Sequence, residues 1–227
     1  MSVLARSRVR SRIVSRAVAQ TCAVKRVPSF LDAADIAAVR RLRDTHALTH
    51  GPAKEVRRGW KTTYLNADGL IRTHAPELLE RLRGLIHLVD SSIFANASDQ
   101  RRHASVAEEM LAALEPRCVE YHACTTGGAL QDPGHFDSGS VVTIDVMLGH
   151  EFQGGAFLTR EADGTMTEHR FALGDALIFP SYKYHTVSPV TAGLREVMVV
   201  EWWNGDAKDC NHRCEVARGN CGGDGRC

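Results

Sequence analysis

The stretch after Pro116 is a series of short apolar segments punctuated by glycines, and this restricts the fold more than any other feature. Segments of four to eight residues, rich in β-branched and aromatic side chains, predict β-strands. The expected strands are Cys118–Ala123, Val141–Leu148, Ala156–Thr159, Thr165–Phe171, Ala176–Phe179 and Glu196–Trp203. Many short strands within ~100 residues are typical of a sandwich or barrel. Asp163-Gly164 between two of them predicts a hairpin turn.

The residues before Pro116 have a helical periodicity instead. The expected helices are Leu31–His46, a segment from Pro76 to near Ala97, and Val106–Leu114. Each has one apolar face, so we expect them to cover one face of the stranded part. Trp60 and Tyr64 lie between the first two helices and are expected to be core or edge aromatics. The fold class predicted from the two halves is α+β.

Composition limits the function classes. The 227 residues have room for one principal core, and 44% apolar with 24% charged residues is ordinary for a globular chain. No run reaches the ~18 apolar residues of a membrane span. A net charge of +1 provides no field to attract nucleic acid. We therefore expect neither a nucleic-acid partner nor a membrane span, and the oligomeric state is open.

The first 27 residues form a basic leader. Residues 1–31 contain no acidic residue and seven Arg or Lys, with Ser and Ala between them. This composition is typical of an organelle transit peptide, and the apolar centre of a secretory signal is missing. The prediction is import into a mitochondrion or plastid. The alternative is a basic tail without an address on a cytoplasmic protein.

Residues 206–227 form a Cys/Gly-rich tail. It holds Cys210, Cys214, Cys221 and Cys227, with His212 among them. Four thiols this close in sequence could bind a zinc ion, form two disulfides, or remain reduced in a flexible tail. Their spacing does not match a pair of CxxC knuckles, so the three alternatives stay open.

Three residues of the stranded half are candidate metal ligands. His135 and Asp137 are two positions apart, so in a strand their side chains would project from one face. His185 follows 50 residues later, where another strand could bring it beside them. Two imidazoles and a carboxylate on one face of an octahedral ion, with open positions, are the ligands of non-haem Fe(II) oxygenases.

Arg195 begins the last long strand. A planar guanidinium holds a carboxylate by two parallel hydrogen bonds, and inside a barrel it needs such a partner. A diacid that chelates the metal at one end and reaches Arg195 at the other would supply it. 2-Oxoglutarate has that shape.

These motifs resemble the iron(II)/2-oxoglutarate-dependent dioxygenase superfamily, specifically its prolyl-4-hydroxylase-like branch. The resemblance covers about residues 117–203. It rests on the His135, Asp137 and His185 triad, on Gly154-Gly155, on the run from Gly174 to Ser181, and on the run from His185 to Thr191 leading to Gly193 and Arg195. It implies a double-stranded β-helix, or jelly roll, over residues 117–205, with a helical part at residues 28–116 packed on it.

The resemblance also implies cofactors and roles. The triad would bind Fe(2+), Arg195 would bind 2-oxoglutarate, and O2 would be the oxidant, with ascorbate as a possible reductant. Tyr121 and Thr143 are further candidate 2-oxoglutarate contacts. No side chain has a catalytic role beyond the metal centre, because the oxidising chemistry belongs to the cofactor.

The implied reaction is hydroxylation of a C–H bond. The family prior favours a prolyl residue of a polypeptide as substrate. One alternative is a small-molecule hydroxylase of the same superfamily. Another is a non-catalytic sensor module that binds metal and 2-oxoglutarate without turnover.

Overall fold

The computed structural model describes residues 16–90 and 107–221, and a seven-stranded sheet lies at its centre. The strand order is β1-β9-β5-β12-β4-β3-β2, and every neighbouring pair is antiparallel. The sheet strands in chain order are β1 Lys25–Val27, β2 Lys54–Arg57, β3 Trp60–Tyr64, β4 Glu115–Cys124, β5 Val142–Met147, β9 Ala176–Pro180 and β12 Arg195–Trp203.

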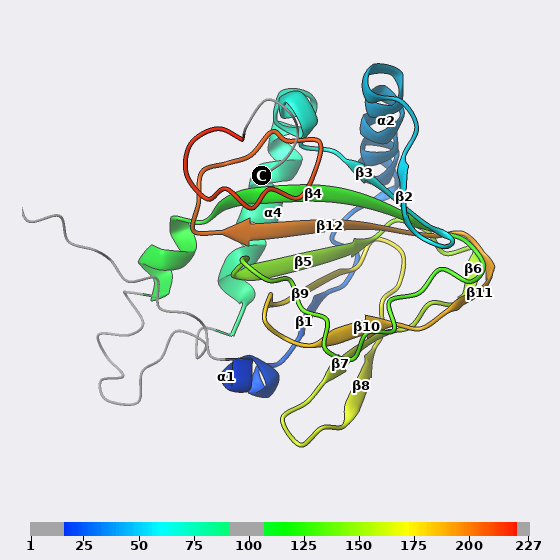
Figure 1. The fold of residues 1–227 in the computed structure, drawn as a ribbon, viewed down its shortest axis with the longest axis vertical. Coiled ribbons are helices and arrows are strands. Elements are labelled where there is room, and N and C mark those ends of the chain that lie inside the picture. Colours follow the sequence, from blue (N-terminus) through cyan, green and yellow to red (C-terminus); the bar gives the residue numbers. More distant parts are fainter. Residues whose placement is uncertain (1–15, 91–106, 222–227) are drawn as a thin grey trace, which may run out of the picture.

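Two smaller sheets lie across from one face of the large sheet (Figure 1). Their orders are β10-β7-β8 and β11-β6. The strands are β6 Phe152–Gly154, β7 Phe157–Arg160, β8 Met166–His169, β10 His185–Val187 and β11 Val190–Gly193. Phe157 of β7 and Val187 of β10, both in the three-stranded sheet, pack with Phe179 and Leu177 of β9 into a second apolar cluster.

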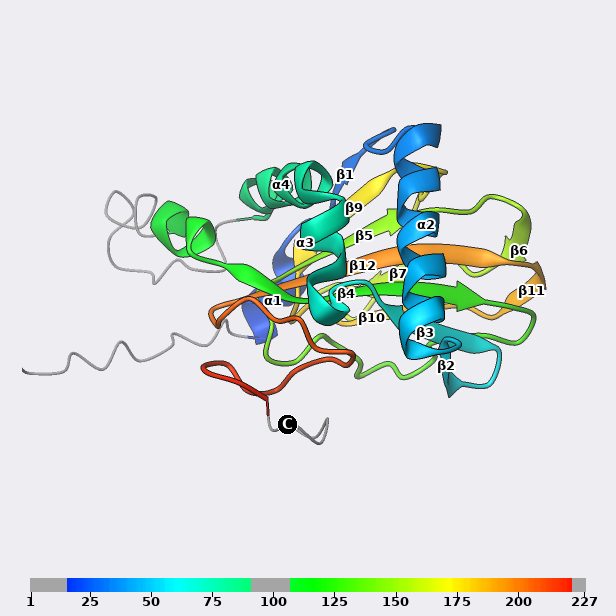
Figure 2. The same cartoon turned by 90° about the horizontal axis from the view of Figure 1, so that it is seen from above.

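Helices cover the opposite face of the large sheet (Figure 2). They are α2 Ala33–His50, α3 Leu70–His74 and α4 Pro76–Leu85, with the short elements η1 Ala67–Gly69 and η2 Ile86–Leu88. The short helix α1 Arg16–Thr21 lies apart from them, toward the smaller sheets (Figure 1). Val39 of α2 and Leu82 of α4 are fully buried against Ile144 and Val200 of the sheet. Each such side chain contributes about 1.5–3 kcal/mol of burial free energy. The mixed helical and antiparallel-sheet class expected from the sequence is confirmed.

The helix boundaries follow local signals. Asp32 and Asp35 form a capping box that begins α2, close to the expected start at Leu31. The second expected helix is shorter than predicted: α4 ends at Leu85, and η2 ends before the extended residue Val89. Gly84 lowers helix propensity at that point, and a closing 3₁₀ turn is common at helix ends. Residues 91–106 lie outside the described residues, and residues 107–112 of the third expected helix are helical.

All six strands predicted after Pro116 are present, and the hairpin at Asp163-Gly164 joins β7 to β8. The expected helical part at residues 28–116 also contains a β-hairpin, which the sequence analysis missed. Its strand β3 pairs with β4 along its whole length and so extends the large sheet. Gly59, at φ +68°, forms the turn between β2 and β3.

Residues 16–27, which the sequence analysis placed in the basic leader, are part of the folded unit. Strand β1 is the edge strand of the large sheet, with Arg26 opposite Leu177 of β9. Gln20 of α1 accepts a hydrogen bond from the backbone N–H of Tyr184 at 3.0 Å and donates one to the carbonyl of Tyr182 at 2.9 Å. The folded part therefore reaches well into the expected leader.

Within residues 16–90 and 107–221, none of the helices combines the length and the apolar character needed to cross a membrane.

Candidate metal centre and its cavity

His135, Asp137 and His185 converge as the sequence predicts. Their ligand atoms all lie within 4.8 Å of one another. Oδ1 of Asp137 is 3.5 Å from Nε2 of His135 and 3.9 Å from Nε2 of His185. The two imidazole rings meet edge to face, with centroids 4.8 Å apart. Three side chains from two distant segments thus present one carboxylate oxygen and two imidazole nitrogens to a common point.

The first two of these residues lie in a loop and not in a strand, which corrects the expected geometry. The loop connects β4 to β5 and is held by backbone hydrogen bonds. The N–H of Asp137 donates to the carbonyl of Ser181 at 2.8 Å, and the N–H of His185 donates to the carbonyl of His135 at 3.1 Å. Phe136, which lies between His135 and Asp137 in the sequence, stacks its ring on that of Tyr182. These backbone hydrogen bonds to Ser181, just after β9, and to His185, at the start of β10, therefore position His135 and Asp137. The alternation of side chains along a strand plays no part.

The protonation of His185 and Asp137 suits a metal. Nδ1 of His185 lies 3.0 Å from the carbonyl of Lys183, which leaves Nε2 to face Asp137. Burial lowers the pKa of His185, so its imidazole is neutral near pH 7. Burial opposes the charge of Asp137, but His185 and His135 outweigh it and hold the pKa of that carboxyl below its usual range. Neutral imidazoles and an ionised carboxylate are the forms that bind metal.

Thr143 contacts the triad rather than the open cavity. Its Oγ1 donates to Oδ2 of Asp137 at 2.7 Å and lies 2.9 Å from Oγ of Ser181. Thr143 faces inward as expected, but its hydroxyl orients a metal-ligand carboxylate, and Thr143 does not line the cavity beside the triad. The expected 2-oxoglutarate contact is therefore not supported by its position.

A cavity of about 260 Å³ opens beside the triad. Besides the three triad residues, its wall includes Arg195 at the start of β12. Arg195 is 2% exposed, and its Nε has no hydrogen-bond partner among the described residues. Burial lowers the pKa of Arg195, and an anion bound there would offset that cost. Nε of Arg195 thus lacks a partner of the kind that the sequence analysis expected a ligand to supply.

Gly155, between β6 and β7, makes room for this arginine. A Cβ at Gly155 would lie 2.7 Å from Cδ of Arg195, closer than real Cβ contacts. Its φ of +65° is also one that glycine adopts without strain. The donor set of the triad and the buried, unpartnered Nε of Arg195 fit Fe(II) together with a diacid. The close approach of Arg195 explains why a glycine stands at position 155, just before strand β7.

Tyr121 lies away from the cavity, which corrects its expected role. On β4 its neighbours Glu120 and His122 line the cavity, so alternation turns Tyr121 to the helix-covered face. Its hydroxyl donates to Glu196, and Nη1 of Arg43 donates to that hydroxyl at 3.0 Å. Burial and the bond to Glu196 raise the pKa of Tyr121 to about 12. Tyr121 belongs to a polar contact between α2 and the sheet.

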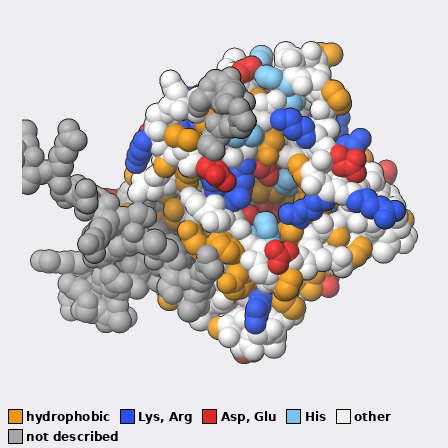
Figure 3. All heavy atoms as spheres, viewed as in Figure 1, with side chains coloured by type: hydrophobic (Ala, Val, Ile, Leu, Met, Phe, Trp, Pro, Cys, Tyr) orange, Lys and Arg blue, Asp and Glu red, His pale blue; other side chains and the backbone are white. Residues whose placement is uncertain are grey.

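Several cavity residues were missed by the sequence analysis. Tyr64 and Trp60 of β3 line the wall, although they were expected to be only core or edge aromatics. Asp145 lies two residues after Thr143 on β5, so the same-face rule could have found it. Arg213 reaches the wall from the C-terminal tail, and no sequence pattern indicated this. Charged and histidine side chains gather around a hollow on the face seen in Figure 3.

No protein-family model matches the sequence, and no curated protein matches it. Solved structures do match its fold. An oxidoreductase of the 2OG-Fe(II) oxygenase family from Burkholderia pseudomallei is 16% identical, with a TM-score of 0.55, over 82% of this chain and 86% of that one. The fold is therefore that of the 2OG-Fe(II) oxygenases.

Prolyl hydroxylases are among the structures that share this fold. A Pseudomonas putida prolyl-4-hydroxylase is 16% identical, with a TM-score of 0.53, over 84% of this chain and 100% of that one. The viral collagen prolyl hydroxylase of Paramecium Bursaria Chlorella virus-1, solved as a 2OG complex, is 11% identical, with a TM-score of 0.51, over 79% of this chain and 94% of that one. The chain thus has the fold of the branch that the sequence resembles.

Proposed function

We propose that the protein is an Fe(II)- and 2-oxoglutarate-dependent oxygenase that hydroxylates a C–H bond, built on a double-stranded β-helix. One observation carries the proposal: the metal-ligand triad and the buried Arg195, whose Nε lacks a partner, line a single cavity. The likeness to oxygenase structures supports it.

The chain's own residues would divide the work. His135, Asp137 and His185 would hold Fe(II) and leave the remaining positions open to ligands. Arg195 would donate hydrogen bonds to the far carboxylate of 2-oxoglutarate and so orient it toward the metal. With O2, the bound iron and 2-oxoglutarate would supply the oxidation that yields succinate and carbon dioxide and places one oxygen atom in the substrate.

Apolar side chains limit water around the metal centre. Leu130, Phe157 and Val187 are buried and line the same cavity. Phe157 lies against the ring of His185, with centroids 5.6 Å apart. By keeping some water from the metal centre, these side chains would help to direct the oxidant toward the substrate and away from side reactions.

We propose a prolyl residue of a polypeptide as the substrate. The likeness to two prolyl hydroxylases supports this choice. The indole of Trp60 and the ring of Tyr64 on the cavity wall also support it, because an apolar ring packs well on aromatic faces. Ascorbate would serve only to keep iron reduced.

The test is succinate formation from 2-oxoglutarate with Fe(II), O2 and a panel of proline-containing peptides. The expected product is a peptide heavier by one oxygen atom on proline, detected by mass spectrometry. His135→Ala and Asp137→Ala should abolish succinate formation, and the exposed His150→Ala should not. Full activity of His135→Ala would overturn the metal assignment.

A second set of variants tests the cosubstrate. Arg195→Ala should raise the 2-oxoglutarate concentration for half-maximal rate by about 10- to 100-fold, from lost charge-assisted bonds of ~1.5–3 kcal/mol. The exposed Arg170→Ala is the matched control. If a compound in a small-molecule extract gains an oxygen atom and the peptides do not, the substrate is a small molecule and the proposal of a prolyl substrate is overturned. Binding of 2-oxoglutarate without any succinate would indicate a sensor module.

A further inference from the structure

The C-terminal tail is fixed on the body of the protein. Nδ2 of Asn66 donates to the carbonyls of Lys208 and Cys210, at 3.0 and 3.2 Å. Nε of Arg117 donates to the carbonyl of Cys214, and Nε2 of His46 lies 2.8 Å from Oδ1 of Asn211. Residues 208–214 therefore follow a defined path along the sheet and helices, although this segment contributes almost no apolar side chains.

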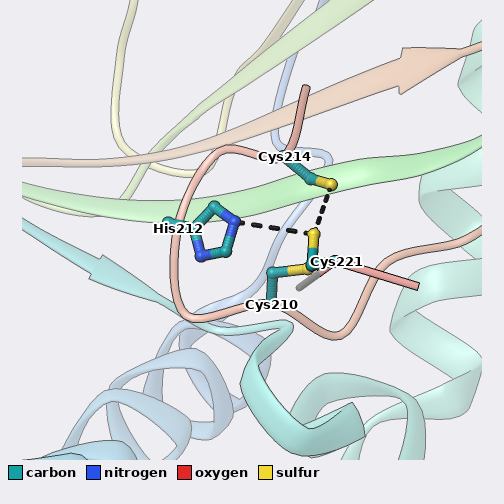
Figure 4. A group of neighbouring side chains, drawn as sticks. All are labelled: Cys210, His212, Cys214 and Cys221. Carbon is teal, nitrogen blue, oxygen red and sulfur yellow. Dashed lines mark hydrogen bonds between the residues drawn. The ribbon is translucent and has the colours of Figure 1, made fainter. Parts of the chain in front are cut away.

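That path brings together four side chains of types that can ligate a metal (Figure 4). They are Cys210, His212, Cys214 and Cys221, and their ligand atoms all lie within 4.8 Å of one another. Sγ of Cys221 is 3.2 Å from Sγ of Cys210, 2.9 Å from Sγ of Cys214 and 3.7 Å from Nε2 of His212. Cys214 is fully buried and the other three are half-buried.

The geometry favours a shared ion over a disulfide. A disulfide requires two sulfurs ~2.05 Å apart, and both sulfur pairs here are wider. Zn–S bonds of ~2.3 Å and Zn–N bonds of ~2.0 Å place tetrahedral ligand atoms about 3.5–3.8 Å apart. Nε2 of His212 already lies at such a distance from Sγ of Cys221. The two sulfur–sulfur distances reach it if each lengthens by less than about 1 Å. A disulfide between two of these cysteines would also not use the imidazole of His212, which lies at the same point.

We propose that Cys210, His212, Cys214 and Cys221 bind a structural zinc ion, which holds the tail as one wall of the cavity. Three thiolates and one imidazole are a common structural zinc set, and thiolate ligands select zinc over the harder Fe(II). The site is separate from the His135, Asp137 and His185 triad, since the two share no residue.

The zinc site would position Arg213, which lies between two of its ligands. Nε of Arg213 is 2.8 Å from Oε1 of Glu201, and its Nη2 donates to the carbonyl of Ser138, next to Asp137, at 3.2 Å. Arg213 also lines the cavity. The proposed zinc binding does not depend on the proposed oxygenase function. The proposed effect of the zinc ion on the cavity does rest on that function.

The test begins with metal analysis of a His135→Ala, Asp137→Ala double variant, which removes the competing site. About one zinc per chain should remain and should be released when a mercurial titrates the thiols. The cobalt-substituted double variant should show thiolate-to-cobalt charge-transfer absorption. Absence of both retained zinc and that absorption would overturn the proposal.

Single variants in the same background test the ligand set. His212→Ala and Cys221→Ser should lower zinc to near zero, while the exposed His150→Ala should keep it. Full retention of zinc in His212→Ala and Cys221→Ser would refute this set. If Cys221→Ser fails to fold, His212→Ala alone decides.

A thiol count excludes the disulfide alternative. All seven cysteines should react in protein unfolded without reductant and in the presence of a chelator. Fewer reactive thiols, with the missing ones mapped to residues 210, 214 or 221, would show a disulfide and overturn the zinc site. In the triad-intact protein, chelation of this zinc should also expose residues 210–221 to hydrogen exchange.

Discussion

Thr143 donates its hydroxyl hydrogen to Oδ2 of Asp137 at 2.7 Å, and Oδ1 of the same carboxylate faces both histidines. The threonine therefore decides which oxygen is offered to a metal. Hydrogen bonds of this kind orient metal ligands, and their removal typically weakens metal binding by ~10–100-fold.

Thr143→Val should weaken Fe(II) or Co(II) binding to the triad by about 10- to 100-fold, because the carboxylate loses its fixed orientation. Thr143→Ser keeps the hydroxyl group and should retain most of the wild-type metal affinity. Metal titration under anaerobic conditions measures the effect, and Thr167→Val on the exposed strand β8 is the control. Equal affinity of Thr143→Val and wild type would show that the hydroxyl does not orient Asp137.

Gly155→Ala should weaken 2-oxoglutarate binding by more than about tenfold, since the new methyl group would displace the side chain of Arg195. Gly127→Ala is a matched control, because Gly127 also has a positive φ, +89°, but a Cβ there meets nothing within 4 Å. Calorimetric titration of the metal-loaded proteins would separate the two. Similar losses in both variants would assign the effect to backbone strain and not to crowding of Arg195.

Removal of residues 1–27 should lower the free energy of unfolding by roughly 3 kcal/mol or more relative to removal of residues 1–15. The longer truncation deletes β1 and the carbonyl of Gln20, which accepts a hydrogen bond at 3.0 Å from the fully buried ammonium of Lys183. It also frees the segment that leads to His185. Urea unfolding measures the difference, and identical midpoints for the two truncations would contradict this role of residues 16–27.

Asp175 gives the protein part of its acid sensitivity. Its carboxylate accepts hydrogen bonds from Nε of Arg26, the N–H of Ser29 and the N–H of Ala172. Burial opposes the charge, but these donors outweigh it and hold the pKa of Asp175 below its usual value. The stability it contributes is therefore present above about pH 4 and is lost as pH falls through the lowered pKa.

Asp175→Asn should cost about 1.5–3 kcal/mol at pH 7 and should show a smaller further loss between about pH 5 and pH 3 than the wild type. Chemical unfolding at each pH measures both effects. The exposed Glu168→Gln should leave the pH profile unchanged. A wild-type slope retained in Asp175→Asn would assign the acid sensitivity to other carboxylates.

The sequence by itself determined which residues are candidates for the site, and it predicted most of the helices and strands. His135, Asp137, His185 and Arg195 were identified from residue type and spacing, because metal ligands and a carboxylate-binding guanidinium are restricted to few side chains. The strands after Pro116 and the start of α2 follow local periodicity and capping, which depend on neighbouring residues only.

Tertiary structure alone decided which side chains reach the cavity. Tyr121 and Tyr64 differ by which face of their strands is turned inward, and that parity is set by the pairing of β3, β4 and β12. The loop holding His135 is positioned by hydrogen bonds to β9 and β10, and residues 16–27 are ordered by partners more than 140 positions away. Such long-range pairing leaves no local pattern in the sequence, so only the folded chain could show that His212 joins the cysteines and that Arg213 enters the cavity.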